Sequence, residues 1–402
     1  MHCIIAKDGR FALNQGKPAS LNLSYHRFWK RYLDVFDSVT VIGRLFAVEE
    51  PLSAPVEGPG VSFLPLPNYL GPEQYLLKKR EIQQKLKFVL QSKSALIMDH
   101  STAGTLLWQQ TRKISRPYGL QVRVDPYDIF APGAVQHPLR PFFRWRSTRE
   151  LKQLCAEACA VSYVTQYALQ QRYPAAENAF STYYSNVELP ETSLVPIPRP
   201  PSPLKNEFTL ISIGSMAHMH KGMDVLIDAV AACVQEGLNL KLILVGKGKY
   251  RAKLEQQVKK LGLENQVCFL GTLTAGKGIF EQLDCSDLFI LPSRAEGLPR
   301  VMVEAMARAL PCIGSTVSGI PELLAPEDLI PPDDVAALAR KIREVLTNPE
   351  RMAHMSARNL KKAKAYAEPI LRQRRIAFYT SVRKQTEAWL KSQWEMKTFV
   401  SQ

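Results

Sequence analysis

Two glutamates, Glu296 and Glu304, lie in a segment that could hold an elongated anionic ligand. A strand is expected to end at Pro292, and a turn then leads into a helix that Leu298 and Pro299 open. Free N–H groups and the positive dipole end of such a helix favour a diphosphate. Glu304 would lie roughly 9 Å along the helix axis. One carboxylate could then hold sugar hydroxyls and the other ribose hydroxyls, whereas the alternative is a solvated Glu296 and a surface Glu304.

A second loop could also meet phosphates. The segment from residue 213 to residue 224 runs from a strand through Gly214 into a helix capped near Asp224. Lys221 is a compact cation suited to neutralising a leaving diphosphate. A surface lysine is the alternative, and His218 and His220 are expected to be ordinary loop histidines because no partner cluster accompanies them.

Short β-branched runs alternate with helical segments along the whole chain, which indicates parallel βαβ units. The proline-rich stretch at residues 196–203 can be neither helix nor central strand, so it predicts a linker between two doubly wound domains. Ligands bind such domains at the carboxyl ends of the strands. The expected strands are residues 3–6, 39–44, 61–65, 95–99, 121–125, 161–165, 209–214, 241–246, 267–271, 288–292 and 312–314, with helices at 224–236, 251–261 and 298–309.

The length and composition support this organisation and exclude other classes. A chain of 402 residues is too long for one core, so two domains are expected. The net charge of +15 is spread nearly evenly over both halves, which argues against a nucleic-acid-binding tail. No apolar stretch is long enough to span a bilayer, and residues 1–5 predict no signal peptide. The seven cysteines show no zinc spacing, and a cytoplasmic location is expected.

The two loops together resemble retaining glycosyltransferase family 4, which has the two-domain GT-B fold. The resemblance covers about residues 207–345. Its most specific element is the E-x7-E motif, matched by Glu296 and Glu304. Further matches are Lys221-Gly222, V-G-K-G at residues 245–248, F-L-G at 269–271 and S-G-I-P-E-L-L at 318–324. The resemblance implies that Glu296 contacts the transferred sugar, Glu304 the ribose and Lys221 the diphosphate.

The resemblance also implies a division of the chain. It predicts an acceptor-binding domain at residues 1–195, a linker at 196–206, a nucleotide-sugar-binding domain at 207–365, and a helical segment at 366–402 that returns to the first domain. The predicted donor-binding residues lie in the loops of the second domain: Gly214, Ser215, Lys221, Gly246, Gly297, Leu298, Pro299, Arg300 and Glu304.

Three positions depart from the family pattern. Ser215 stands where the family usually has an arginine, and Arg300 is the nearest candidate to replace its charge. Ala309 stands where glycine is common, and Ser318 replaces the first residue of a usual Gly-Gly pair. Because Glu296 and Lys221 are intact, we expect these changes to tune the enzyme.

The N-terminal half matches less closely, as expected of the half that meets a variable acceptor. Asp125 follows a predicted strand where many relatives carry a histidine, so we expect it to act catalytically beside the anomeric centre, with a helix or turn cap as the alternative. Asp99, His100 and Asp128 are the candidates for acceptor binding.

The resemblance implies a metal-independent mechanism without a cofactor. No Asp-x-Asp triad occurs in a metal-binding context, so Lys221 and a helix dipole would stabilise the leaving nucleoside diphosphate. Retention without an obvious nucleophile near Glu296 suggests front-face attack, in which the leaving phosphate oxygen takes the acceptor proton. The donor is expected to be UDP- or GDP-linked, and the acceptor a glycan or a polyprenyl-diphosphate-linked sugar in cell-surface polysaccharide assembly.

A basic and aromatic segment at residues 137–149 suggests a membrane contact. Arginines and aromatic rings alternate there, which suits an anionic interface, although single-stranded nucleic acid or an ordinary helix start would also fit. We favour a peripheral position on the inner face of the plasma membrane and no nucleic acid. The expected contacts are Arg140, Phe142, Phe143, Arg144, Trp145, Arg146 and Arg149.

The sequence supports other functions less well. A nucleotide-sugar epimerase or a glycogen-synthase-like chain extender would share the fold. A non-catalytic nucleotide-sugar-binding protein would be expected to lose Lys221 or one of the paired glutamates. A nicotinamide dehydrogenase is disfavoured because no GxGxxG follows the first strand.

Overall fold

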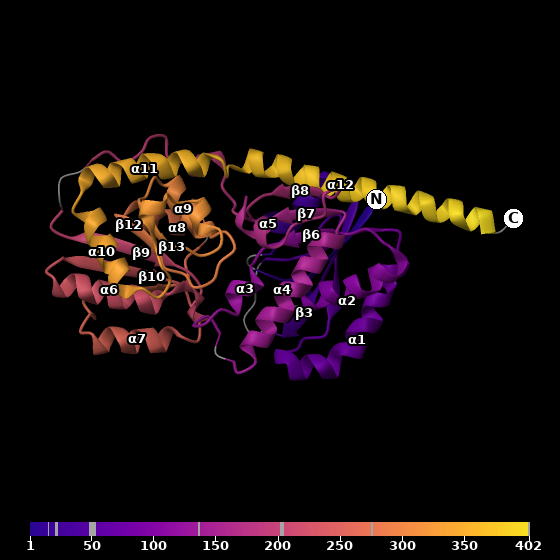
Figure 1. Cartoon of the computed structure of the whole chain (residues 1–402), viewed down its shortest axis with the longest axis horizontal. Helices are drawn as coiled ribbons and strands as arrows, with labels where there is room; N and C mark the ends of the chain where they lie inside the picture. The colour runs from indigo at the N-terminus through magenta and orange to yellow at the C-terminus, as the bar shows by residue number, and fades with distance from the viewer. Residues whose placement is uncertain are drawn as a thin grey trace.

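The chain folds into two lobes that stand side by side (Figure 1). The computed structural model describes residues 1–14, 16–20, 23–47, 54–135, 137–201, 205–274 and 276–400. Each lobe is built on its own sheet. We call them the N-terminal and the C-terminal lobe. The prediction of two doubly wound α/β domains is confirmed.

The N-terminal lobe contains a sheet of eight strands within the described residues, in the order β4-β3-β1-β5-β6-β7-β8, with β2 paired to β1. All neighbours are parallel except β1 and β2. The strands are β1 His2–Asn14, β2 Lys17–Ala19, β3 Ser38–Ala47, β4 Val61–Leu66, β5 Ala95–Asp99, β6 Gly119–Val122, β7 Ala160–Tyr163 and β8 Phe180–Tyr183. The helices are α1 Gly71–Gln91, α2 Thr102–Thr111, α3 Pro126–Ile129, α4 Arg140–Glu157 and α5 Ala168–Arg172, with η1 Tyr25–Trp29 and η2 Lys30–Asp34.

The C-terminal lobe contains six parallel strands within the described residues, in the order β11-β10-β9-β12-β13-β14. Strand order reverses between β9 and β12, which is where such sheets bind ligands. The strands are β9 Phe208–Ile213, β10 Leu240–Val245, β11 Val267–Gly271, β12 Leu288–Leu291, β13 Cys312–Ser315 and β14 Leu329–Ile330. The helices are α6 Met223–Gln235, α7 Arg251–Lys260, α8 Lys277–Asp284, α9 Arg300–Ala307, α10 Val335–Leu346 and α11 Pro349–Lys364.

The last helix, α12 Glu368–Val400, leaves the C-terminal lobe and runs along the N-terminal one (Figure 1). It packs against β5, β6, β7 and β8. Its apolar residues Leu371, Phe378, Tyr379 and Val382 are completely buried. Gly119 on β6 makes room for it, because a Cβ there would meet the side chain of Val382. One continuous helix therefore completes the core of the first lobe.

Close contacts, among them those of Gly297 and Glu322, fix the lobes to each other. Gly297 lies so close to the backbone of Arg123 that a Cβ at this position would overlap its carbonyl oxygen. The carboxylate of Glu322 accepts from the backbone N–H groups of Gln166, at 2.6 Å, and Ala168, also at 2.6 Å. The Glu322 carboxylate of the C-terminal lobe thus caps the start of α5 in the N-terminal lobe, where free N–H groups favour a negative charge.

The structure corrects some of the expected boundaries. The strand expected at residues 121–125 ends at Val122, because Asp125 and Pro126 begin α3 instead. The helix expected at residues 298–309 spans Arg300–Ala307, with Pro299 as its N-cap. Strands β2, β8 and β14 were not expected. Part of the proline-rich stretch, residues 202–204, lies outside the described residues.

Candidate active site

Lys221 and Glu296 meet at the switch point of the C-terminal sheet. Lys221 ends the loop that follows β9, and Glu296 lies in the loop that follows β12. Their side chains form an ion pair, and the Ser293 hydroxyl donates to the same oxygen, Oε1 of Glu296, at 2.8 Å. Only 9% of the Glu296 side chain and 22% of the Lys221 side chain are exposed, so solvent screens the pair weakly. The structure therefore brings the two residues together.

Glycines shape the loop around Lys221. The Lys221 side chain lies over Gly214, where a Cβ would meet its aliphatic carbons. Gly222 has φ of +64°, and any side chain there would overlap the carbonyl oxygen of Pro292. A Cβ on Gly246 would likewise overlap the backbone of Gly214. The predicted Lys-Gly and Val-Gly-Lys-Gly motifs thus allow three loops to approach one another closely.

Helix α9 begins directly after this ion pair. Gly297, Leu298 and Pro299 form the entry to the helix, and all three are buried. Glu304 lies inside α9 and is partly buried, whereas Arg300 at the helix start is exposed. Unpaired N–H groups at this end are suited to phosphate oxygens.

The sequence reasoning did not single out Arg294, which holds the two loops in place. Its guanidinium makes two hydrogen bonds of 2.8 Å to the carboxylate of Asp224 and one of 2.6 Å to Asp333. It also donates to the carbonyl of Met219 at 2.7 Å. Such a bidentate pair fixes geometry as well as charge. Arg294 lies two residues before Glu296, and this proximity to the motif is the sequence feature that could have pointed to it.

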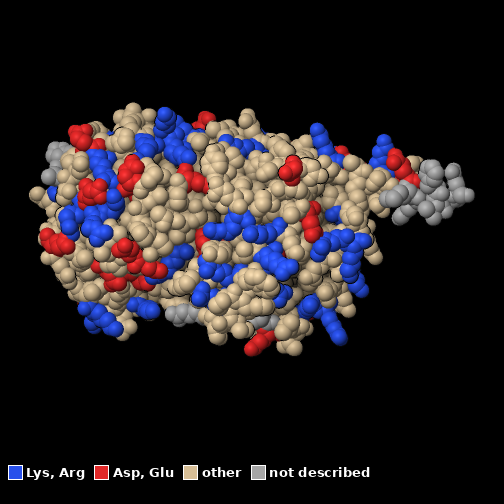
Figure 2. Space-filling view, viewed as in Figure 1, with Lys and Arg blue, Asp and Glu red and all other residues tan. Residues whose placement is uncertain are grey.

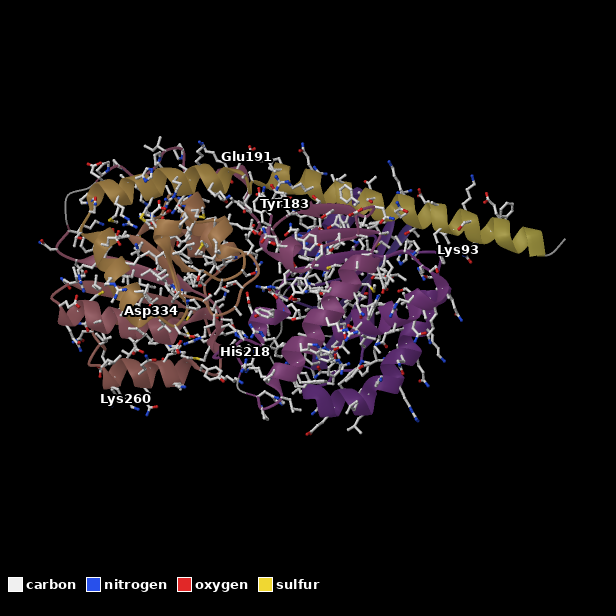
Figure 3. The ribbon with its side chains drawn as sticks, viewed as in Figure 1. Lys93, Tyr183, Glu191, His218, Lys260 and Asp334 are labelled. Carbon is white, nitrogen blue, oxygen red and sulfur yellow. The ribbon has the colours of Figure 1, made fainter. Side chains whose placement is uncertain are left out.

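The other polar residues of the Lys221 loop make contacts that are common in loops. Ser215 is exposed, and its hydroxyl accepts from the Ala217 N–H at 3.2 Å. The rings of His218 and His220 stack with 5.1 Å between centroids. His218 lies where the two lobes face each other (Figure 3). Burial, followed by the charges of His218 and Lys221, lowers the pKa of His220.

Asp125 is held by groups of its own lobe. Its side chain caps α3 by accepting from the Tyr127 N–H at 2.9 Å, and it also accepts from the Tyr173 hydroxyl at 2.5 Å. It forms an ion pair with Arg172, and only 2% of the residue is exposed. This geometry favours the capping interpretation over a role at the anomeric centre. Burial and Asp125 raise the pKa of neighbouring Asp128 to about 6.

The other acceptor candidates differ in their partners. The imidazole of His100 pairs with Glu150 at 3.3 Å. Asp99 ends β5, and its buried Oδ1 has no hydrogen-bond partner among the described residues. Of these two candidates, Asp99 is therefore the one whose carboxylate oxygen can still accept a hydrogen bond from a ligand.

A pocket of about 230 Å³ between the lobes contains residues that the sequence reasoning missed. Lys7, Arg123 and Glu188 line it from the N-terminal lobe, and Leu298 and Arg300 line it from the C-terminal lobe. Neither Lys7 nor Arg123 belongs to a recognisable motif.

The basic and aromatic start of α4 is partly used by the fold. Arg140 donates to the Phe130 carbonyl and Arg144 to the Tyr127 carbonyl, at 2.9 and 2.8 Å. Phe143 packs on Phe130, with 5.9 Å between ring centroids. These three predicted membrane contacts thus also hold the α3 region in place.

The other four predicted contacts, Phe142, Trp145, Arg146 and Arg149, are exposed, including 48% of Phe142 and 58% of Trp145. Lys and Arg side chains gather over the face that α4 crosses (Figure 2). In the described part of the chain, no helix is long and apolar enough to cross a bilayer. The same residues contain no group of three or more His, Cys, Asp and Glu side chains arranged to hold a metal ion.

Comparisons with known proteins agree with this geometry. Residues 197–362 match the sequence model of the family Glycosyl transferases group 1. Protein CapJ of Staphylococcus aureus is 27% identical over 85% of each chain. A GDP-mannose-dependent monoacylated alpha-(1-6)-phosphatidylinositol monomannoside mannosyltransferase of Corynebacterium glutamicum is 28% identical over 52% of this chain and 59% of its own length. The residues matched by the family model include Lys221, Glu296 and Glu304.

A solved structure extends the likeness to the whole fold. Anabaena HepE, solved in complex with UDP-glucose, is 20% identical, superposes with a TM-score of 0.62, and is covered along 100% of its length by 98% of this chain. The predicted GT-B architecture is therefore confirmed.

Proposed function

We propose that this protein is a retaining, metal-independent glycosyltransferase. It moves a sugar from a UDP- or GDP-linked donor held by the C-terminal lobe to a glycan or lipid-linked acceptor in cell-surface polysaccharide assembly. One observation carries the proposal most directly: the buried pair of Lys221 and Glu296 at the sheet's switch point, beside the start of α9. That position in a doubly wound sheet is where phosphate-bearing ligands bind.

The donor would lie along α9. Its diphosphate would meet the N–H groups at the helix start and the ammonium of Lys221, while Glu304 would accept from the ribose hydroxyls. Glu296 would then accept from the hydroxyls of the transferred sugar. The names of two compared proteins support a nucleotide-linked donor, since one relative depends on GDP-mannose and HepE was solved with UDP-glucose.

Transfer would proceed on the face that the diphosphate leaves. The glycosidic carbon–oxygen bond to the diphosphate breaks as the acceptor hydroxyl oxygen bonds to the same carbon, and the departing phosphate oxygen takes the hydroxyl proton. Lys221 and the α9 dipole would stabilise the charge that develops on the diphosphate.

The start of α4 supports a membrane-bound setting for the acceptor. Four arginines occupy the first ten positions of this helix, and the positive end of the helix dipole opposes the charge of Arg140 in the first turn. This arrangement weakens the helix but provides an anion-binding face. Exposed Phe142 and Trp145, with 6.1 Å between ring centroids, add apolar surface that could enter a lipid interface.

The test combines donor binding with product stereochemistry. The protein is mixed with UDP-, GDP- and ADP-sugars in excess EDTA, and the shift of its melting temperature selects the donor. The anomeric proton coupling of the first product, or of the sugar released by slow hydrolysis, then reports retention. A β-linked product from an α-linked donor, or activity that EDTA removes and magnesium restores, would contradict the mechanism.

A further inference from the structure

The pocket between the lobes lies at the switch point of the N-terminal sheet. Strand order reverses between β1 and β5, and the last paired residues are Ala6 and Met98, so Lys7 and Asp99 follow them side by side. The pairing of β1 with β3 shifts register between Ala6 and Arg10, which marks Lys7 as part of a bulge. Bulges near active sites redirect side chains, and here the side chain of Lys7 lines the pocket.

Three cations of this lobe surround one aromatic ring. The Phe28 ring centroid lies 4.5 Å from Lys7 Nζ, 3.7 Å from the Arg31 guanidinium carbon and 5.3 Å from that of Arg123. The negative face of the ring attracts each of them. The exposed Arg300 adds a fourth positive charge from the opposite lobe.

The acidic groups in the described part of the chain do not balance these charges. Arg31 donates to the Asn186 side chain at 3.0 Å and Arg123 to that of Gln121, both neutral. Glu188 lines the same pocket, and Asp99 lies close enough to favour the charged form of Lys7. Among the described residues, Lys7 and three arginines therefore gather near two carboxylates, so basic groups outnumber acidic ones.

The crowding of positive charge affects Lys7 most. Burial, followed by the charge of Arg123, holds the pKa of Lys7 well below its ordinary value, and Arg31 and Arg300 lower it further. Burial beside three guanidinium groups therefore disfavours the ammonium form of Lys7. A bound anion would favour the ammonium form and offset the repulsion among these groups.

We propose that Lys7 and Arg123, with Arg300 opposite them, form a subsite for an anionic group on the acceptor, either a phosphate or a carboxylate. The inference rests on the proposed function and names the acceptor class. Asp99, whose buried Oδ1 lacks a partner in the described chain, accepts from a hydroxyl of the same acceptor. The subsite thereby selects a charged acceptor over a neutral sugar.

The experiment separates this subsite from the donor site. Wild-type protein is saturated with UDP or GDP, whichever it binds, to fill the donor site. Its melting temperature is then followed during titration with inorganic phosphate or with glucuronate, each against chloride of equal ionic strength. The comparison uses Lys7→Met/Arg123→Met, with Lys7→Met alone as a milder variant. Lys253→Met/Arg340→Met removes two exposed cations of the C-terminal lobe as the matched control.

We expect one of the two anions to bind the wild type and the control at least tenfold more tightly than it binds the Lys7→Met/Arg123→Met variant. The anion that binds more tightly identifies the charged group of the acceptor. Binding of the nucleotide, measured before the anion is added, should be the same in the wild type and in both Lys7 variants. Equal anion binding by variant and wild type, or no binding above chloride, overturns the subsite. Failure of the wild type to bind either UDP or GDP instead contradicts the proposed function.

Discussion

Lys221 and Glu296 neutralise each other across the switch point of the C-terminal sheet. The two residues lie 75 positions apart in the chain, yet they share one hydrogen bond. The resemblance assigns them to different parts of the donor, Lys221 to the diphosphate and Glu296 to the sugar. A bound donor would therefore exchange this protein–protein contact for two protein–ligand contacts, and its affinity should include the cost of separating the pair.

Replacing Lys221 by alanine should lower turnover by about 10²–10³, the loss expected when one charge-stabilising group is removed. Donor affinity should fall less than turnover, because in the free protein Lys221 is already paired with Glu296. Steady-state kinetics at saturating donor measure the effect. Lys253→Ala, which removes an exposed lysine from α7, is the control. Unchanged turnover in Lys221→Ala would remove this residue from the site.

The two motif glutamates should respond differently to mutation. Glu296→Gln should mainly depress kcat, since contacts at the reacting centre strengthen in the transition state. Glu304→Gln should mainly weaken donor binding, because the ribose does not change during transfer. Measurement of kcat and of the donor Kd for both variants tests the assignment. If the two variants lose kcat and affinity in the same proportion, the order of sugar and ribose along α9 is wrong.

Membrane binding should depend on the exposed part of the α4 start. Each cation near an anionic leaflet contributes about 1 kcal/mol, and inserted aromatic rings add to this. We expect cosedimentation with anionic vesicles at low salt and release at about 1 M salt, where screening shortens to about 3 Å.

The informative variant changes Phe142, Trp145, Arg146 and Arg149 to serine. Arg140 and Arg144 stay, because they tie α4 to the carbonyls of Phe130 and Tyr127. Sedimentation should be lost while slow donor hydrolysis continues, and Lys253→Ser/Arg340→Ser should sediment like the wild type. Vesicle binding that persists in the quadruple variant would show that this segment is not the part of the protein that binds the membrane.

Ser318→Gly should stabilise the protein by about 1 kcal/mol. Ser318 has φ of +46°, a left-handed conformation that disfavours a side chain, and its buried hydroxyl has no partner among the described residues. Ser318→Ala removes the hydroxyl but keeps the strained backbone, so its gain should be smaller. Thermal unfolding midpoints compare the three proteins, and a lower midpoint for the glycine variant would contradict the strain.

The sequence predicted best what depends on local pattern. Hydrophobic runs located the central strands, and residues 95–99 and 267–271 match β5 and β11 at both ends. Lys221 and Glu296 were found because each lies in a short motif after a strand, and parallel strands deliver such loops to one edge. Ala309 and Ser318, expected to replace glycines, do adopt positive φ values of 54° and 46°.

What the sequence did not predict depends on contacts between distant segments. The strand expected to reach Asp125 stops earlier. Asp125 caps α3 and also binds Arg172 and Tyr173, which lie 47 and 48 residues away and which local pattern cannot reveal. Lys7 was missed because its position follows from a bulge and from the pairing of β1 with β5. Glu322 belonged to a recognised motif, but its role in capping α5 became apparent only once the lobes were placed together.

Helix α12 reverses the order in which the lobes can be finished during synthesis. The N-terminal lobe emerges from the ribosome first, yet Leu371, Phe378, Tyr379 and Val382 of its core follow almost the entire C-terminal lobe in the chain. Until those residues appear, the sheet face formed by β5 to β8 stays uncovered. The lobe made first is thus completed last, and a chain released after residue 365 would have all the elements of the C-terminal lobe but an apolar surface on the N-terminal lobe that is open to chaperones.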